Sequence, residues 1–292
     1  MDRDSASGGN IMHAATTAEP RAMGLPISNG KLAMWLFLAT EIMFFSGLIG
    51  GYIVNRFGLP VWPTPAQVHL VEWMGAVNTF VLICSSVTIV LAYKAMTQQH
   101  VGKALQFIFL TMALGGVFMV IKVVEYRGKY DHNVIPGRVR EVADAGYAKE
   151  LREITVPALQ ALADTAEQKA YVGKLEAFSK ELTEGTLSTT RALRRARELE
   201  EEFHKVFGHS HEVHLPQLIP MGNLWASWYF TLTGIHALHV LGGMVIFTIM
   251  LLMAAAGKFG PERVKFVELS GLYWHFVDIV WIFLFPLLYL LG

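Results

Sequence analysis

The sequence has few charged residues and almost no cysteine. Charged side chains make up 16% of its 292 residues, whereas a soluble domain carries about a quarter. Basic and acidic residues are equal in number, so the formal net charge is zero and gives no reason to expect a nucleic-acid partner. The one cysteine, Cys84, lies in an apolar run, which excludes an intrachain disulfide and a thiolate metal cage. A Gly-rich phosphate loop and a Gly-x-Ser-x-Gly elbow are also missing, and no set of residues assembles a catalytic centre.

What the sequence does have is long apolar runs. Each of them reaches the roughly 20 residues that a membrane-spanning helix needs. The runs cover residues 32–55, 71–93, 104–126, 223–256 and 266–291. We therefore predict an all-α integral membrane bundle of five transmembrane helices. Because no basic-then-apolar leader precedes the first run, we expect the first helix to insert the protein itself.

The predicted organisation has four parts, and the third is unlike the rest. They are an N-terminal tail (1–31), the first three spans (32–126), a charged extramembrane insertion (127–222) and the last two spans (223–292). Residues 127–219 hold 29 of the 48 charged side chains, so this segment cannot enter lipid. Basic residues near the ends of the short loops favour a cytoplasmic N-terminus, with the insertion and the C-terminus outside. On the predicted cytoplasmic side these residues are Lys31, Lys94, Lys103, Lys258, Arg263 and Lys265, whereas Arg127 and Lys129 count against the assignment.

Two helical stripes within the insertion predict an antiparallel hairpin. The first contains Tyr171, Leu175, Phe178 and Leu182 and ends at Gly185; the second contains Leu193, Ala196, Leu199, Phe203 and Val206 and ends at Gly208. Glycine after the last periodic residue is a helix-stop signal, and Pro157 is expected to open the first helix. The stripes can pack on each other or on a partner. Because the net charge of the insertion is near zero, we expect a packed contact with a partner subunit through stripes such as Tyr171, Leu175, Phe178 and Leu182.

Ionisable side chains within the spans form the candidate site, because such residues are costly in lipid and usually functional. They are Glu41, Lys122, Glu125, His236, His239, His275 and Asp278. The plainest role for the histidines is hydrogen bonding between helices, for example to Asp278. A b-type haem between His275 and His236 or His239 is an alternative, as is a proton relay through Glu41. A carboxylate-bridged di-metal site needs more Glu-x-x-His motifs than this chain has.

Four motifs in order resemble the subunit III family of haem–copper oxidases, of the cytochrome c oxidase type. They are KLAMWLFLATEIMFFSGLIGGYIVNRF (31–57), NTFVLICSSVTIVLA (78–92), TGIHALHVLGG (233–243) and YWHFVDIVWIFLFPLLY (273–289). The segment GGVFMVIKVVEY (115–126) resembles the remaining helix, with Lys122 where the family typically has Gln. Five helices rather than seven resembles the bacterial form that lacks the first two. The insertion matches no part of the family pattern.

The resemblance implies a non-catalytic subunit of a respiratory terminal oxidase that reduces oxygen to water while subunit I pumps protons. Haems and copper would be held by partner subunits, and this chain would carry no cofactor except bound phospholipid. It implies contact with subunit I and subunit II, and that the chain supports proton uptake and oxygen access. The implied cleft for lipid and oxygen is at Glu41, with Trp35, Phe44, Phe45 and Arg56 along the same segment. Glu268 also matches a family acid, and His275 and Asp278 would stabilise the bundle or tune its contact with subunit I.

The sequence and the resemblance leave several points open. The electron donor could be cytochrome c, quinol or a supercomplex partner, and residues 156–207 are expected to contact such a partner. A subunit of nitric oxide reductase is a further alternative. With the first two family helices missing, subunit I or another neighbour is expected to supply two helices beside the lipid cleft. The expected location is the bacterial plasma membrane. A candidate site for zinc or copper lies in the insertion, at His209, His211 and His214 with His204 before them. The alternative is that these histidines are solvated loop residues.

Overall fold

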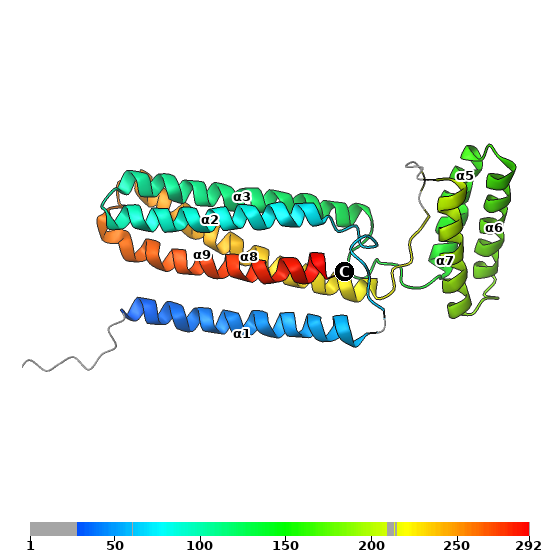
Figure 1. Ribbon diagram of the computed structural model, residues 1–292, viewed down its shortest axis with the longest axis horizontal. Coiled ribbons are helices and arrows are strands. Elements are labelled where there is room, and N and C mark those ends of the chain that lie inside the picture. The colour runs from blue at the N-terminus through cyan, green and yellow to red at the C-terminus, as the bar shows by residue number, and fades with distance from the viewer. Residues whose placement is uncertain (1–27, 60, 209–212, 214, 292) are drawn as a thin grey trace, which may run out of the picture.

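The computed structural model describes residues 28–59, 61–208, 213 and 215–291, and within these ranges all regular structure is helical (Figure 1). Five of the described helices are long and apolar enough to span a membrane. They are α1 (Asn29–Gly58), α2 (Glu72–Thr97), α3 (Val101–Asp131), α8 (Gly222–Ala255) and α9 (Val264–Phe285), which is preceded by the 3₁₀ turn η2 (Pro261–Arg263) and followed by the π-helical turn η3 (Pro286–Leu290). The predicted all-α bundle of five transmembrane helices is therefore confirmed.

Helices α2, α3, α8 and α9 pack together (Figure 1). Helix α1 lies along one side of these four and contacts α9 and α8. Only Phe45 and Tyr52 of α1 are buried, so most of this helix is exposed. Within the four packed helices, the indole of Trp274 lies directly against Gly115 of α3 and Gly243 of α8. A Cβ at Gly243 would lie 2.5 Å from the Trp274 ring, and one at Gly115 would lie 2.9 Å from it. The absence of these two side chains lets three helices meet around one aromatic ring.

The insertion forms a separate helical unit at one end of the bundle. Its elements are α4 (Ala145–Glu150), the π-helical turn η1 (Leu151–Thr155), α5 (Val156–Leu162), α6 (Ala166–Thr183) and α7 (Thr189–Val206). Helices α6 and α7 run across the direction of the bundle, and the unit lies at the same end as the C-terminus (Figure 1). The bundle and the insertion have different cores, with no buried residue in common. The insertion therefore folds around its own apolar side chains.

The α6–α7 pair is the predicted hairpin, but its first helix begins later than the sequence suggested. Helix α6 begins after Thr165, whose side chain accepts from the backbone of Gln168 in a capping box. The expectation that Pro157 opens the first hairpin helix is wrong, because Pro157 lies in the preceding helical run of α4, η1 and α5. Proline has no N–H to donate and crowds the preceding turn, and the π-helical turn η1 directly before it accommodates this interruption.

The apolar stripes of the hairpin pack against each other and against α4–α5, so the expectation that Tyr171, Leu175 and Phe178 contact a partner is wrong. Tyr171, Leu175 and Phe178 are each at most 1% exposed. The Tyr171 hydroxyl donates to the Leu199 carbonyl at 2.8 Å, and burial raises the pKa of Tyr171, so the phenol keeps the proton that it donates. Of the two alternatives left open by the sequence, packing within the insertion is the one that the structure contains.

One side chain of α8 holds the insertion against the bundle. Asn223 Oδ1 accepts from the backbone N–H groups of Gly137 and Val139, at 2.9 and 3.1 Å, and Nδ2 donates to the Val139 carbonyl at 2.8 Å. The Asn223 backbone N–H donates to Glu141 at 2.7 Å. The chain leaving the bundle is thus bonded to the start of the helix that re-enters it, and the two linkers of the insertion are held side by side.

Candidate functional site

A carboxyl–imidazole pair joins the outlying helix α1 to the bundle. Glu41 Oε2 and His239 Nε2 are 3.1 Å apart, and each side chain is about one-fifth exposed (20% and 19%). His239 Nδ1 donates to the Ile235 carbonyl at 2.9 Å, so this nitrogen carries a proton. Nε2 must then either accept a proton from a neutral Glu41 or donate one to the carboxylate. The contact therefore places one proton between the two side chains, in a mostly apolar setting.

Aromatic rings surround this pair on the side of the bundle. Phe45 packs edge-on against the His239 ring at 5.2 Å and against Phe276 at 6.0 Å. The Tyr273 hydroxyl donates to the His239 carbonyl at 2.9 Å. Trp35 and Phe44, in contrast, are exposed. The polar pair thus lies at the edge of an apolar surface, within reach of whatever lies beside α1.

A second polar cluster is completely enclosed. Lys122 Nζ donates to Glu125 Oε2 at 2.9 Å and to the hydroxyls of Tyr289 and Tyr229, at 2.9 and 3.1 Å. Both tyrosine hydroxyls donate to Glu125 Oε1 at 2.6 Å. All three ammonium protons and both carboxylate oxygens are therefore engaged. The cluster ties α3 to α8 and to the C-terminal turn η3.

Lys129 continues this cluster one turn further along α3. It is 1% exposed, its Nζ donates to the Val68 carbonyl, and it lies over the rings of Trp225 and Tyr229 at 5.4 and 5.5 Å. A buried ammonium requires such partners, since an unpaired one would be strongly destabilising. Helix α3 extends beyond the predicted end at residue 126, to Asp131, with this side chain buried near its end.

The remaining ionisable residues of the candidate site lie apart from these clusters. Lys31 Nζ donates to Glu268 at 2.5 Å, which ties the start of α1 to α9. Arg56 donates to the Leu291 carbonyl through Nε and Nη2, at 3.2 and 3.1 Å. His275 Nδ1 is 2.6 Å from the Ser86 hydroxyl.

The expected hydrogen bond from Asp278 to an imidazole of a neighbouring helix is not present. Asp278 is buried, no imidazole among the described residues is hydrogen-bonded to its carboxyl oxygens, and the Ser86 hydroxyl of α2 is the polar group beside it. His236 is also buried and unpartnered there, with its ring packed against Phe118 and Trp281. His239 bonds to Glu41. Of the two imidazoles of α8, His236 is thus packed among aromatic rings, and His239 is bonded to Glu41 on α1 and not to Asp278.

The histidines proposed as a haem pair lie in three different surroundings. His236 is enclosed by aromatic rings, His239 faces Glu41, and His275 faces Ser86 on α2. Among the described residues, no group of three or more His, Cys, Asp or Glu side chains is placed to hold a metal ion. The candidate metal ligands His209, His211 and His214 lie outside the described residues.

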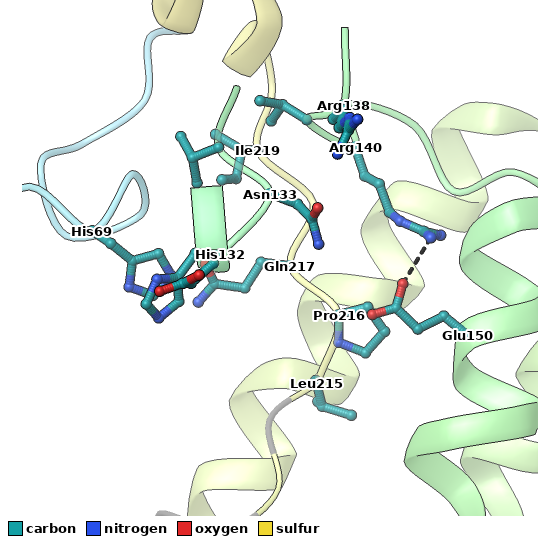
Figure 2. A pocket seen from close by; sticks show the side chains of 13 residues that line it. His69, His132, Asn133, Arg138, Arg140, Glu150, Leu215, Pro216, Gln217 and Ile219 are labelled. Atoms are coloured by element: carbon teal, nitrogen blue, oxygen red, sulfur yellow. Dashed lines mark ion pairs between the residues drawn. The ribbon is translucent and has the colours of Figure 1, made fainter. Parts of the chain in front are cut away.

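A cavity of about 540 Å³ lies where the bundle meets the insertion (Figure 2). On one side the rings of His69 and His132 stack with centroids 4.1 Å apart. On the other side Arg140 forms an ion pair with Glu150 at 2.7 Å. Acidic and basic groups both line this cavity, so it has no strong preference for ligands of one charge.

Comparison with known proteins decides the family. The profile of the family described as cytochrome c oxidase subunit III matches residues 12–131 and 217–292, which is most of the chain and leaves out the insertion. The chain belongs to the cytochrome c oxidase subunit III family. As a family member it is a multi-pass membrane protein that associates with other subunits of an oxidase.

Curated cytochrome c oxidase subunit 3 proteins are similar over most of their length. The protein of Corynebacterium diphtheriae is 25% identical over 257 residues, covering 87% of this chain and 84% of the relative. That of Synechocystis sp. is 24% identical over 257 residues, covering 88% and 73%. That of Alkalihalophilus pseudofirmus is 21% identical over 275 residues, covering 94% and 93%.

Sequence reasoning missed several residues that complete the polar clusters of this subunit III family member. Tyr229, Tyr289 and Lys129 were absent from the candidate list, and His239 was not paired with Glu41. Lys129 had a readable signal, because Lys122, Glu125 and Lys129 follow one another at helical spacing on one face of α3. The tyrosines had none, since aromatic residues are frequent throughout the spans.

Proposed function

We propose that this chain is the non-catalytic subunit III of a respiratory haem–copper oxidase that reduces oxygen to water and pumps protons through subunit I. Its role is to hold phospholipid beside α1 and to support subunit I in proton uptake and oxygen access. The observation that carries this proposal is the Glu41–His239 pair, a proton-sharing group on a helix that is otherwise mostly exposed and apolar. Such a surface suits lipid chains, with the polar pair as an anchor or proton-holding point.

The haems and copper belong to the partner subunits in this proposal. His239 bonds to Glu41 and His275 to Ser86, which supports a chain without haem ligands, and the ring of His236 is packed against Trp281. A redox-active subunit that binds b-type haem is the competing function, and a subunit of nitric oxide reductase is another. The electron donor is cytochrome c, a quinol or a supercomplex partner.

The proposed orientation has the N-terminus in the cytoplasm and the insertion and C-terminus outside a bacterial plasma membrane. Lys129 had counted against this orientation, but its ammonium is buried against the Val68 carbonyl. A buried and bonded lysine does not act as a free loop charge, so the balance of basic residues favours the proposed orientation more than the bare sequence did.

Purification of a tagged chain from membranes tests the proposed function. We expect it to bring down a haem–copper subunit, and we expect the chain separated from that complex to show no Soret absorption. A Soret band that stays with the separated chain and disappears in His275→Leu would instead establish the haem-binding alternative. Identification of the co-purifying large subunit by mass spectrometry separates a terminal oxidase from a nitric oxide reductase.

We also propose that the insertion contacts a partner subunit or an electron carrier through its polar exterior, within residues 156–207. The hydrogen bonds of Asn223 to Gly137 and Val139 support this, because they hold the start of the insertion beside α8 and so limit the orientations open to it. Deleting residues 156–207 is expected to leave the bundle folded and to lower the yield of complete complex. The measurement is the subunit composition after gel filtration, and an equally stable, complete complex would rule out an assembly role.

A further inference from the structure

The imidazole of His275 is at mid-membrane depth on the surface of the bundle. The residue lies midway between Pro261 and Leu290, the limits of the last candidate span. Its side chain is partly exposed, and Nδ1 is 2.6 Å from the Ser86 hydroxyl. Within the described residues, Nε2 has no hydrogen-bond partner. In either tautomer Nε2 is a donor or an acceptor, so this partly exposed side chain has one polar atom without a hydrogen-bond partner among the described residues.

Hydrocarbon cannot satisfy that atom. An unpaired polar group in the bilayer core is strongly disfavoured, because no water is present to replace the missing hydrogen bond. Histidines in membrane helices for this reason usually face other protein groups. The Ser86–His275 pair thus marks its surroundings as a surface that protein covers.

The surroundings have the shape and chemistry of a helix-docking face. On α9 the exposed residues Ile279, Ile282 and Phe283 follow His275 at helical spacing, so they share its face. On the adjacent α2 the exposed residues are Phe80, Ile83 and Val87. Helices α2 and α9 are in direct contact, as the bond from Trp274 to Ser85 at 2.9 Å illustrates. The result is an apolar strip with one polar atom near its centre.

We propose that this α2–α9 face binds a transmembrane helix of a partner oxidase subunit, which supplies a hydrogen-bonding side chain or carbonyl to His275 Nε2. The partner helix presents apolar residues to the strip and one polar group at mid-membrane depth. This inference rests on the proposed function, because it assigns one surface to the association with other oxidase subunits. Within a dry interface that single bond fixes the depth and rotation of the partner helix.

Lipid and a second copy of this chain are the other candidates for the strip. Acyl chains match the apolar residues but leave Nε2 unsatisfied. A second copy of this chain could pair its His275 with that of the first. The two copies would then cover the strip and leave it closed to the oxidase subunits with which this family associates. A partner helix with a polar group satisfies both the apolar strip and the imidazole.

Photo-crosslinking in the intact complex tests the assignment. A benzoylphenylalanine placed at Ile279, one turn from His275, is expected to form a covalent product with a transmembrane segment of the haem–copper subunit. The matched control carries the same group at Val120, an exposed residue of α3, and is expected to give a different product. Mass spectrometry of the linked peptide identifies the partner helix and shows whether a polar residue lies near the crosslink.

Substitution of His275 provides the energetic test. His275→Leu is expected to speed release of this subunit in detergent about three- to tenfold, the effect of one membrane hydrogen bond, and His275→Gln to speed it less. Thr248→Val is the matched control. Its hydroxyl bonds to the Met244 carbonyl of α8 and to Met112 Sδ of α3, both within this chain, so the variant is expected to leave release unchanged.

The outcomes separate this inference from the proposed function. If the wild-type complex forms but Ile279 links only to lipid, to a second copy or to nothing, the docking face is wrong while the proposed function stands. Equal release rates for wild type and His275→Leu would also overturn the inference. If no oxidase subunit accompanies the wild-type chain, the proposed function itself fails.

Discussion

Replacement of Lys122 with methionine is expected to destabilise the subunit by about 3–5 kcal/mol, because it leaves the Glu125 carboxylate buried without its counter-charge. Lys122 and Glu125 are 2% and 6% exposed, so water cannot take the place of the missing ammonium. The measurement is the thermal unfolding of the purified subunit in detergent, together with the amount incorporated into the complex.

Two further variants make this result specific. Lys180→Met removes a lysine from an exposed pair with Glu184 at 3.8 Å and is expected to change stability by less than about 1 kcal/mol. The double variant Lys122→Met, Glu125→Gln removes both charges and is expected to recover much of the loss, since Tyr229 and Tyr289 can still donate to the amide oxygen. If Lys122→Met alone were as stable as wild type, the cluster would have no structural role.

Replacement of Glu41 with alanine is expected to leave the initial rate of oxygen reduction nearly unchanged and to shorten the working life of the oxidase. The substitution removes the partner of His239, which is also the only carboxyl side chain of α1. It leaves unchanged all of the groups proposed to carry out the redox chemistry. The measurement is oxygen consumption followed until activity ceases, reported as the number of turnovers completed.

Glu41→Gln and Glu72→Ala are the controls for that experiment. Gln retains a hydrogen-bonding group for His239 but cannot gain or lose a proton as a carboxyl group does, so the working life of this variant separates anchoring from proton holding. Glu72 is an exposed acid at the start of α2, and its loss is expected to have no effect. Loss of activity in the first turnovers of Glu41→Ala would instead indicate a direct part in catalysis.

The five spans were readable from the sequence because length and hydropathy decide whether a helix crosses a membrane. The Glu41–His239 contact was not, since the two residues are 198 positions apart and which helices pack together is not encoded in the periodicity of either one. Lys129 was read as a loop charge because the apolar run ends at residue 126, yet the Val68 carbonyl allows it to be buried.

The insertion shows a second limit of pattern reading. The stripe of Tyr171, Leu175 and Phe178 predicts a helix with a covered face, but an apolar face does not say which surface covers it. The preceding run of α4, η1 and α5 was not predicted as a separate helix, so its place against α6 was not anticipated. Once that run supplies the cover, the stripe has no apolar surface left for a partner.

The clasp formed by Asn223 makes the extramembrane unit exchangeable. It brings residues 137–141 beside the start of α8, so the entry and exit of the loop are neighbours, and no buried side chain is shared between the two cores. A foreign domain whose termini lie close together could be grafted between these linkers without disturbing the spans. A fluorescent reporter or an electron-carrying module placed there would be displayed at the same end of the bundle as the C-terminus.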